Sequence, residues 1–288
     1  MYAMNNIEKF ENDIVEEIHK GYDECEIEYD SSVNDYRTVM LQYISMLNRV
    51  IGPKKRCVHI SHELMSRISG TDQESKRLKG LIDDMKEKLK NGDDVNGHLS
   101  KLVFKDMNKT DKMLDDWSIY HLHLCLGSPN VFDKARTQSG DLLMAVILFD
   151  DAYFIDVTSH SNDDWFDVRY LKIIKDNWEQ ELLNRHDDII DVPNLDESVS
   201  AIKEFRKAGI NSFIHKIDDN YYSSKYAFGY SLAETSNKAM FSLISLNKYL
   251  EKLDFNYDHM TFNAFNINCL CTIYDDQNNS VEIIRKMP

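Results

Sequence analysis

The chain has 288 residues, 42% of them hydrophobic and 11% aromatic, which is enough to build the core of one large domain or two ordinary ones. Its formal net charge of −15 disfavours indiscriminate binding to nucleic acid, although residues 45–112 carry more basic than acidic side chains and can meet phosphate locally. Five scattered cysteines without a CxxC pair, no signal-peptide pattern and no apolar stretch long enough to span a bilayer predict a cytoplasmic protein without membrane contact.

Helical periodicity dominates the first hundred residues. Apolar residues three and four positions apart predict a helix around residues 7–18 and a second from about residue 36 to residue 51. Pro53 ends the second helix, because proline cannot continue its hydrogen bonds. The same spacing predicts a third helix over residues 57–69.

A fourth helix is expected to follow Gly70. Thr71 and Glu74 have the spacing of a capping box, and an apolar stripe runs from there to Gly92. The polar segment 91–98 is the best candidate for a linker.

The pattern then changes to alternation, which is typical of strands. Residues 117–126 predict one strand, and residues 142–160 predict two strands around a turn at Asp150 and Asp151. Further predicted elements are helices over 166–184 and 196–208, a helix that starts at the capping-box spacing of 231–234, and a hairpin that turns at 275–279. We therefore expect an α+β protein with a helical N-terminal region and an antiparallel β-sheet core flanked by helices.

This fold class implies two regions. Residues 1–92 are expected to form the helical region, and residues 98–288 an α+β domain. The chemistry is expected near residues 112–165, because histidines and other catalytic residue types are concentrated there.

Two histidines lie one residue apart in the first predicted strand. Because side chains alternate across a strand, His121 and His123 share a face with Cys125, opposite a face of leucines. The leucine face is the natural core face. The histidine face is then either a functional cleft or a second packed surface.

Polar residues cluster in the next forty positions. The polar loop before the hairpin and the hairpin's second strand carry Lys134, Arg136, Thr137, Ser139, Tyr153, Asp156 and His160. Three hypotheses fit this set. In the first, the histidines act as acid and base in metal-independent RNA cleavage, with Arg136 binding phosphate. In the second, His121, His123 and His160 bind zinc in a hydrolase. In the third, the histidines are structural and the protein is a binding or regulatory module.

Residues 111–178 resemble bacterial ribonuclease toxins and phage-defence effectors of the RelE-like and barnase/EndoU/colicin-like kind. The resemblance implies that His121 or His123 is the acid/base, His160 the second acid/base and Arg136 the phosphate clamp. Ser139 is a further catalytic candidate, and Lys134, Thr137 and Tyr153 are expected to contact the substrate. The prediction is an endoribonuclease without metal or cofactor. Its partners are RNA, an antitoxin or other regulatory protein bound by the additional helices, or a second copy of the chain.

Overall fold

A computed structural model describes residues 2–105, 110–127, 129, 140–159, 167–189, 198–211, 214–231, 235–253, 257–262, 269–275 and 277–284. The chain forms two compact units, which we describe separately. The first comprises Met1–Gly52, Leu102–Thr110 and Thr235–Pro288, and the second Pro53–Lys101 and Asp111–Glu234. The expected division near residues 92–98 lies inside the second unit.

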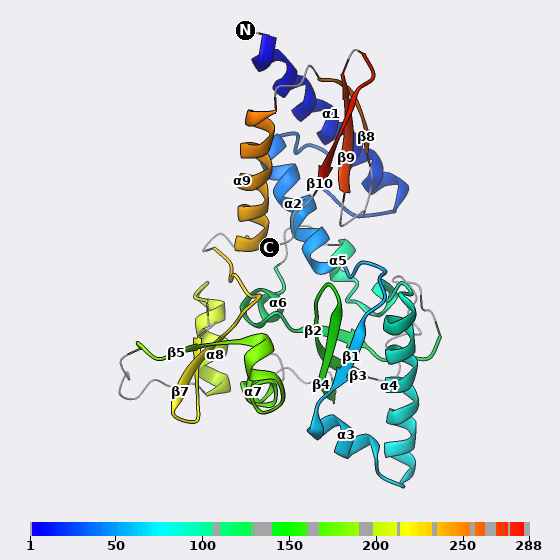
Figure 1. The fold of residues 1–288 in the computed structure, drawn as a ribbon, viewed down its shortest axis with the longest axis vertical. Helices are drawn as coiled ribbons and strands as arrows, with labels where there is room; N and C mark the ends of the chain where they lie inside the picture. Colours follow the sequence, from blue (N-terminus) through cyan, green and yellow to red (C-terminus); the bar gives the residue numbers. More distant parts are fainter. Residues whose placement is uncertain are drawn as a thin grey trace. The chain divides into compact units, whose positions relative to one another are not determined.

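Helices and mostly antiparallel sheets confirm the predicted α+β class, including its helical N-terminus (Figure 1). Among the described residues, no helix is both long enough and apolar enough to cross a membrane.

The first unit combines four helices of the described chain with a small sheet. Its elements are α1 (Tyr2–Glu24), α2 (Tyr36–Arg49), α5 (Leu102–Lys105), α9 (Asn237–Lys252), β8 (Tyr257–Phe262), β9 (Cys269–Asp275) and β10 (Ser280–Ile284). The positions of α1, α2 and the β9–β10 hairpin confirm the sequence predictions. β8 pairs with β9 and completes an antiparallel sheet of order β10-β9-β8. α1 packs on β8, where the rings of Phe10 and Tyr257 lie 5.6 Å apart, and α2 packs along α9.

The second unit is built around a four-stranded sheet of order β1-β4-β3-β2. Its strands are β1 (Cys57–Ile60), β2 (Tyr120–His123), β3 (Asp141–Ile147) and β4 (Asp151–Ser159). β3 and β4 are the predicted hairpin. β1 pairs parallel to β4, whereas the other neighbours are antiparallel.

Helices and a second sheet surround these strands. They are α3 (His62–Ile68), α4 (Gln73–Asn91), the 3₁₀ turn η1 (Asn96–His98), α6 (Lys112–Trp117), α7 (Arg169–Leu182), α8 (Val199–Lys207), β5 (Leu183–His186), β6 (Ile214–Ile217) and β7 (Asn220–Ser224). α7 and α8 lie where the sequence predicts helices. β5, β7 and β6 form an antiparallel sheet in that order.

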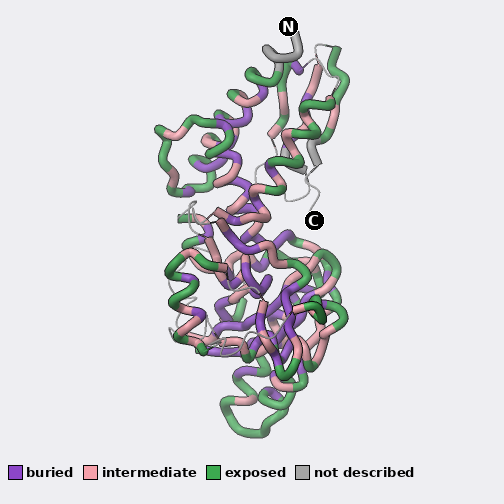
Figure 2. The backbone as a smooth tube through the Cα atoms, turned by 90° about the vertical axis from the view of Figure 1, so that its left-hand side faces the viewer, coloured by how far each residue is buried: buried purple, intermediate pink, exposed green. Residues whose placement is uncertain are grey.

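Both faces of the four-stranded sheet are packed. Leu122, Leu143 and Phe154 are buried on one face. The other face contributes Leu142, Met144 and Ile155 to a core shared with apolar residues of α6 and α7. Figure 2 shows the buried segments of this unit gathered in its interior.

Four local predictions were wrong. The helix expected to start at residues 231–234 begins later, since α9 starts at Asn237 and its N-cap is Ser236. Residues 57–69 are not one helix, because β1 occupies residues 57–60 and the Ser61 side chain caps α3 by accepting from the Leu64 N–H at 3.0 Å. The cap of α4 is Asp72, not Thr71, and its carboxylate accepts from the Ser75 N–H at 2.9 Å. The strand predicted over 117–126 is shorter, since α6 continues to Trp117 and β2 spans only Tyr120–His123.

Candidate functional site

The two histidines of β2 follow directly on helix α6. Ser118 ends this helix in a left-handed conformation (φ 60°), which turns the chain into the strand. A buried ion pair connects α6 to α8. In it the Arg206 guanidinium donates to the Asp116 carboxylate at 2.9 Å. The position of β2 against α6 is therefore fixed by tertiary packing.

His121 and His123 lie on the face of the sheet that α6 and α7 pack against. His121 is opposite Met144 and His123 opposite Leu142, and both of these partners belong to the core on that face. The centroids of the two imidazoles are 6.4 Å apart. His123 is buried at 6% exposure, whereas the His121 side chain retains 15%. Of the two histidines, His121 is the one that reaches solvent.

A carboxylate lies beside His121. Asp111 is the N-cap of α6, and its Oδ1 accepts from the Leu114 N–H at 3.1 Å. Its Oδ2 lies 3.5 Å from His121 Nδ1, so the two groups form an ion pair when the imidazole is protonated. One carboxylate thus caps the helix and provides a negative charge at the histidine.

A buried polar network lies beneath His123. The His98 ring is buried, and its Nδ1 is 2.8 Å from the His123 carbonyl oxygen. Lys88 Nζ lies 3.2 Å from His98 Nε2 and donates to the Gly127 carbonyl. Because an ammonium group only donates, His98 accepts at Nε2 and carries its proton at Nδ1. This network holds the backbone at the end of β2.

A cation lies across the sheet from His123, beside strand β4. Thr158 is opposite Leu142, which is in turn opposite His123, so these three residues form one row across β4, β3 and β2. Arg169, the first residue of α7, donates to the Tyr170 hydroxyl at 2.9 Å and approaches Thr158 Oγ1 at 3.5 Å. Strands are spaced by about 4.8 Å, so the Thr158 and His123 backbones lie about 10 Å apart.

Most of the remaining predicted site residues lie outside the described part of the chain: Lys134, Arg136, Thr137, Ser139 and His160. Their roles stay predictions. Among the described strands, the end of β2, the start of β3 and the end of β4 are at the same end of the sheet.

Tyr153 is not brought near the β2 histidines. It lies on β4 opposite His59 of β1, and the two rings stack with centroids 4.7 Å apart. The Trp178 ring packs edge-on at 5.1 Å. Burial and the neighbouring Asp151 carboxylate raise the pKa of Tyr153 to about 12, so its hydroxyl is protonated at neutral pH.

A second group of chemically capable residues adjoins Tyr153. Within the described ranges, Cys57, His59 and Asp151 are the His, Cys, Asp or Glu side chains that are close enough together to hold one ion. His59 Nε2 donates to Asp151 Oδ1 at 2.8 Å. Sequence reasoning missed this group because the predicted helix over residues 57–69 would have placed Cys57 and His59 on different faces.

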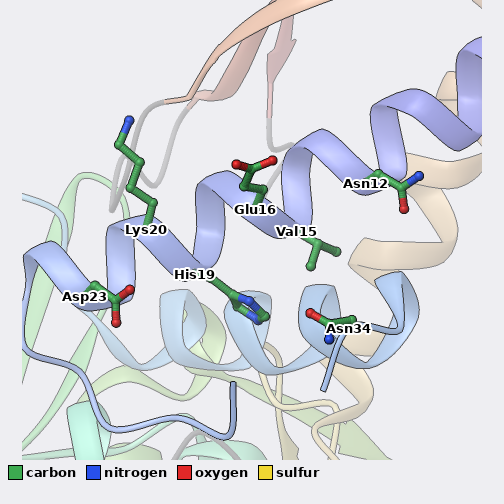
Figure 3. A pocket seen from close by; sticks show the side chains of 7 residues that line it. All are labelled: Asn12, Val15, Glu16, His19, Lys20, Asp23 and Asn34. Atoms are coloured by element: carbon green, nitrogen blue, oxygen red, sulfur yellow. The ribbon is translucent and has the colours of Figure 1, made fainter. Parts of the chain in front are cut away.

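The first unit has a separate surface hollow of about 430 Å³ along α1 (Figure 3). Figure 3 shows that α1 supplies most of its lining, including Glu16, His19, Lys20 and Asp23, with Asn34 from the segment before α2. Burial lowers the pKa of His19 and so favours its neutral form. The lining mixes acidic and basic groups that do not suggest one type of ligand or reaction, so we assign this hollow no function.

Searches of protein-family models, curated proteins and solved structures returned no match to this chain. The functional argument therefore rests on the chemistry of the described side chains.

Proposed function

We propose that this chain is an endoribonuclease that cleaves RNA without a metal ion. In such a reaction a base takes the proton of the ribose 2′-hydroxyl, the resulting oxygen attacks the adjacent phosphate, and an acid protonates the departing 5′-oxygen. His121 is the described residue that we assign to this proton transfer. His123 is buried behind it and is assigned to hold the end of β2.

The observation that carries the proposal is the pairing of His121 with Asp111. A carboxylate beside an imidazole orients the ring and stabilises the imidazolium that forms when the base accepts a proton. The 3.5 Å contact and the 15% exposure of the His121 side chain give that ring both a charged neighbour and access to solvent. His123 at 6% exposure has much less access.

Charge stabilisation at the phosphate is the second requirement. Arg169 projects from the start of α7 toward Thr158, in the row of residues that includes His123. A guanidinium group binds phosphate oxygens with two parallel hydrogen bonds. We assign Arg169 this role together with the predicted Arg136, and we retain His160 and Ser139 as the predicted second acid/base and accessory group.

The biological setting follows from the resemblance to ribonuclease toxins. We propose a cytoplasmic toxin or anti-phage effector that acts on RNA and is restrained by an antitoxin or other regulatory protein. The first unit, with its added helices, is the part that we assign to that regulator or to a second copy of the chain.

The test compares two histidines that each lie beside an aspartate. His121→Ala is expected to lower the rate of cleavage of a labelled RNA by about 100-fold or more, because a lost acid or base typically costs 10² to 10⁴ in rate. His259→Ala is the matched control, since His259 on β8 contacts Asp258 at 3.0 Å but lies in the first unit. This control should cleave RNA at the wild-type rate.

Full activity in His121→Ala would refute the assigned role. Absence of RNA cleavage by the wild-type chain in the presence and absence of its regulator would refute the proposed function itself and favour a binding module.

A further inference from the structure

We infer that Cys57, His59 and Asp151 form a binding site for a transition-metal ion of the Zn²⁺ class, separate from the histidines of β2. The site arises from the parallel pairing of β1 with β4. Cys57 is directly opposite Asp151, and His59 is two residues further along the same face of β1. One potential ligand atom from each of the three side chains lies within 4.8 Å of the other two.

The donor set selects the class of ion. A thiolate and an imidazole are ligands that Zn²⁺ prefers, and a carboxylate oxygen completes three of its four tetrahedral positions. Mg²⁺ and Ca²⁺ favour all-oxygen ligands and do not suit a site that contains sulfur and nitrogen. The fourth position is left to water or to a ligand from solution.

The three side chains are accessible to an ion from solution. Cys57 is exposed, and the side chains of His59 and Asp151 are 37% and 38% exposed. β1 is an edge strand of its sheet, and no other strand among the described residues pairs with its outer side. An ion can therefore reach the site without rearrangement of the sheet.

Neighbouring residues hold the ligands in place. The Tyr153 ring stacks on the His59 imidazole at 4.7 Å and 17°, and the Trp178 ring braces Tyr153 in turn. Tyr153 contacts His59 through its stacked ring, so we assign this residue to position the imidazole. The adjacent Asp150 is engaged by Lys54 at 2.6 Å, which leaves Asp151 as the carboxylate at the site.

Metal binding displaces a proton. Nε2 of His59 can bind the ion only when its proton has moved to Nδ1 or to solvent, and the Cys57 thiol must release its proton to solvent. Binding is therefore expected to weaken as the pH falls, because protons compete for the same atoms.

This inference does not depend on the proposed ribonuclease activity. The site lies on β1 and the start of β4, whereas the catalytic assignment is on β2, and β1 and β2 are the two opposite edge strands of the four-stranded sheet. Cys57→Ser should lose the metal and keep RNA cleavage, whereas His121→Ala should lose cleavage and keep the metal. The failure of either proposal can thus be recognised separately.

The first experiment titrates the metal-stripped full chain with Zn²⁺ and with Co²⁺. We expect one ion per chain and, with Co²⁺, a near-ultraviolet thiolate-to-cobalt absorption band. Cys57→Ser and His59→Gln should each weaken binding by at least about 100-fold. Even substitution of a residue that only hydrogen-bonds to a metal ligand lowers metal affinity by about 10- to 100-fold. Cys25→Ser, a change of another exposed cysteine, should bind as the wild type does.

Two results would overturn the assignment. One is Zn²⁺ binding by Cys57→Ser that equals the wild type. The other is a loss in Tyr153→Phe as large as that in Cys57→Ser, because Phe keeps the stacked ring and removes only the hydroxyl.

A second measurement needs no variant and so does not depend on whether the variants fold. Stoichiometric Zn²⁺ should slow the alkylation of Cys57 in the wild-type chain by at least about tenfold, measured by peptide mass spectrometry, and should leave Cys25 unprotected. Equal labelling of Cys57 with and without Zn²⁺ would contradict the site.

Discussion

At the scale of single residues, His121 and His123 have the same side chain but differ in their neighbours and in their exposure to solvent. His121 lies beside the Asp111 carboxylate and reaches solvent, whereas His123 is buried and its carbonyl oxygen accepts from His98. Sequence alternation correctly placed both on one strand face. It did not reveal that this face is packed, because part of its cover comes from α7, which lies far from β2 in the sequence.

Asp111→Asn tests whether the carboxylate supports His121. Asparagine is as good an N-cap as aspartate, so α6 should keep its stability while the negative charge is lost. We expect kcat for RNA cleavage to fall about fivefold with KM unchanged, because a charge interaction of about 1 kcal/mol is removed. Asp115→Asn in the same helix is the control. Equal kcat values for the two variants would refute the role of Asp111.

Lys88 is predicted to stabilise the second unit from inside. It lies 2.5 Å from Asp84 and also contacts His98 and the Gly127 carbonyl. Lys88→Met keeps most of the aliphatic volume but removes these hydrogen bonds, so the free energy of unfolding should fall by about 2 kcal/mol. Exposed Lys90→Met should change it by less than about 0.5 kcal/mol. Urea unfolding followed by tryptophan fluorescence measures both, and equal changes would contradict the prediction.

At the scale of elements, local patterns succeeded where one segment determines its own structure. The apolar stripes of α1, α2 and α7 and the alternation of β3 and β4 are readable from neighbouring residues. β1 was not, because Ile60, Leu64 and Ile68 recur at helical spacing. The strand is instead defined by its pairing with β4, some 94 positions away at Cys57 and Asp151. The metal site could not be predicted for the same reason.

The start of α4 gives a prediction about capping and pH. Hydrogen bonds from the Ser75 hydroxyl and N–H lower the pKa of Asp72, so the charged cap stabilises the folded state above the pKa of an unfolded aspartate, about 3.9. Asp72→Ala should therefore lower the urea midpoint at pH 7, and the difference from wild type should shrink as the pH falls below about 4.

Thr71→Ala serves as the control for this prediction, since the structure places the cap one residue later. Its urea midpoint should match the wild type at both pH values. A larger effect of Thr71→Ala than of Asp72→Ala would restore the capping box expected from the sequence.

At the scale of the whole molecule, the ends of the chain belong to one unit. Residues 235–288 supply α9, which packs on α2, and β8, which packs on α1. Within this unit the Tyr36 hydroxyl donates to Asn247 at 2.9 Å. The N-terminal helices α1 and α2 of the first unit therefore need the C-terminal segment to cover them.

Deletion of residues 235–288 should accordingly loosen the N-terminal helices. We expect amide hydrogens of α1 and α2 to exchange at least about tenfold faster in the truncated chain, because the apolar faces of these helices lose their cover. Amides of β3 and β4 in the second unit are the internal reference and should keep their protection. Unchanged exchange in α1 and α2 would contradict this division of the chain.

The central claim is metal-independent RNA cleavage through His121, and the chemistry of the product tests it most directly. The measurement is the end group on the upstream RNA fragment after incubation with the purified chain in excess EDTA. The account predicts 2′,3′-cyclic phosphate ends, formed by the wild type and reduced about 100-fold or more by His121→Ala. Cleavage that requires a divalent ion, or that leaves 3′-hydroxyl ends, would contradict it.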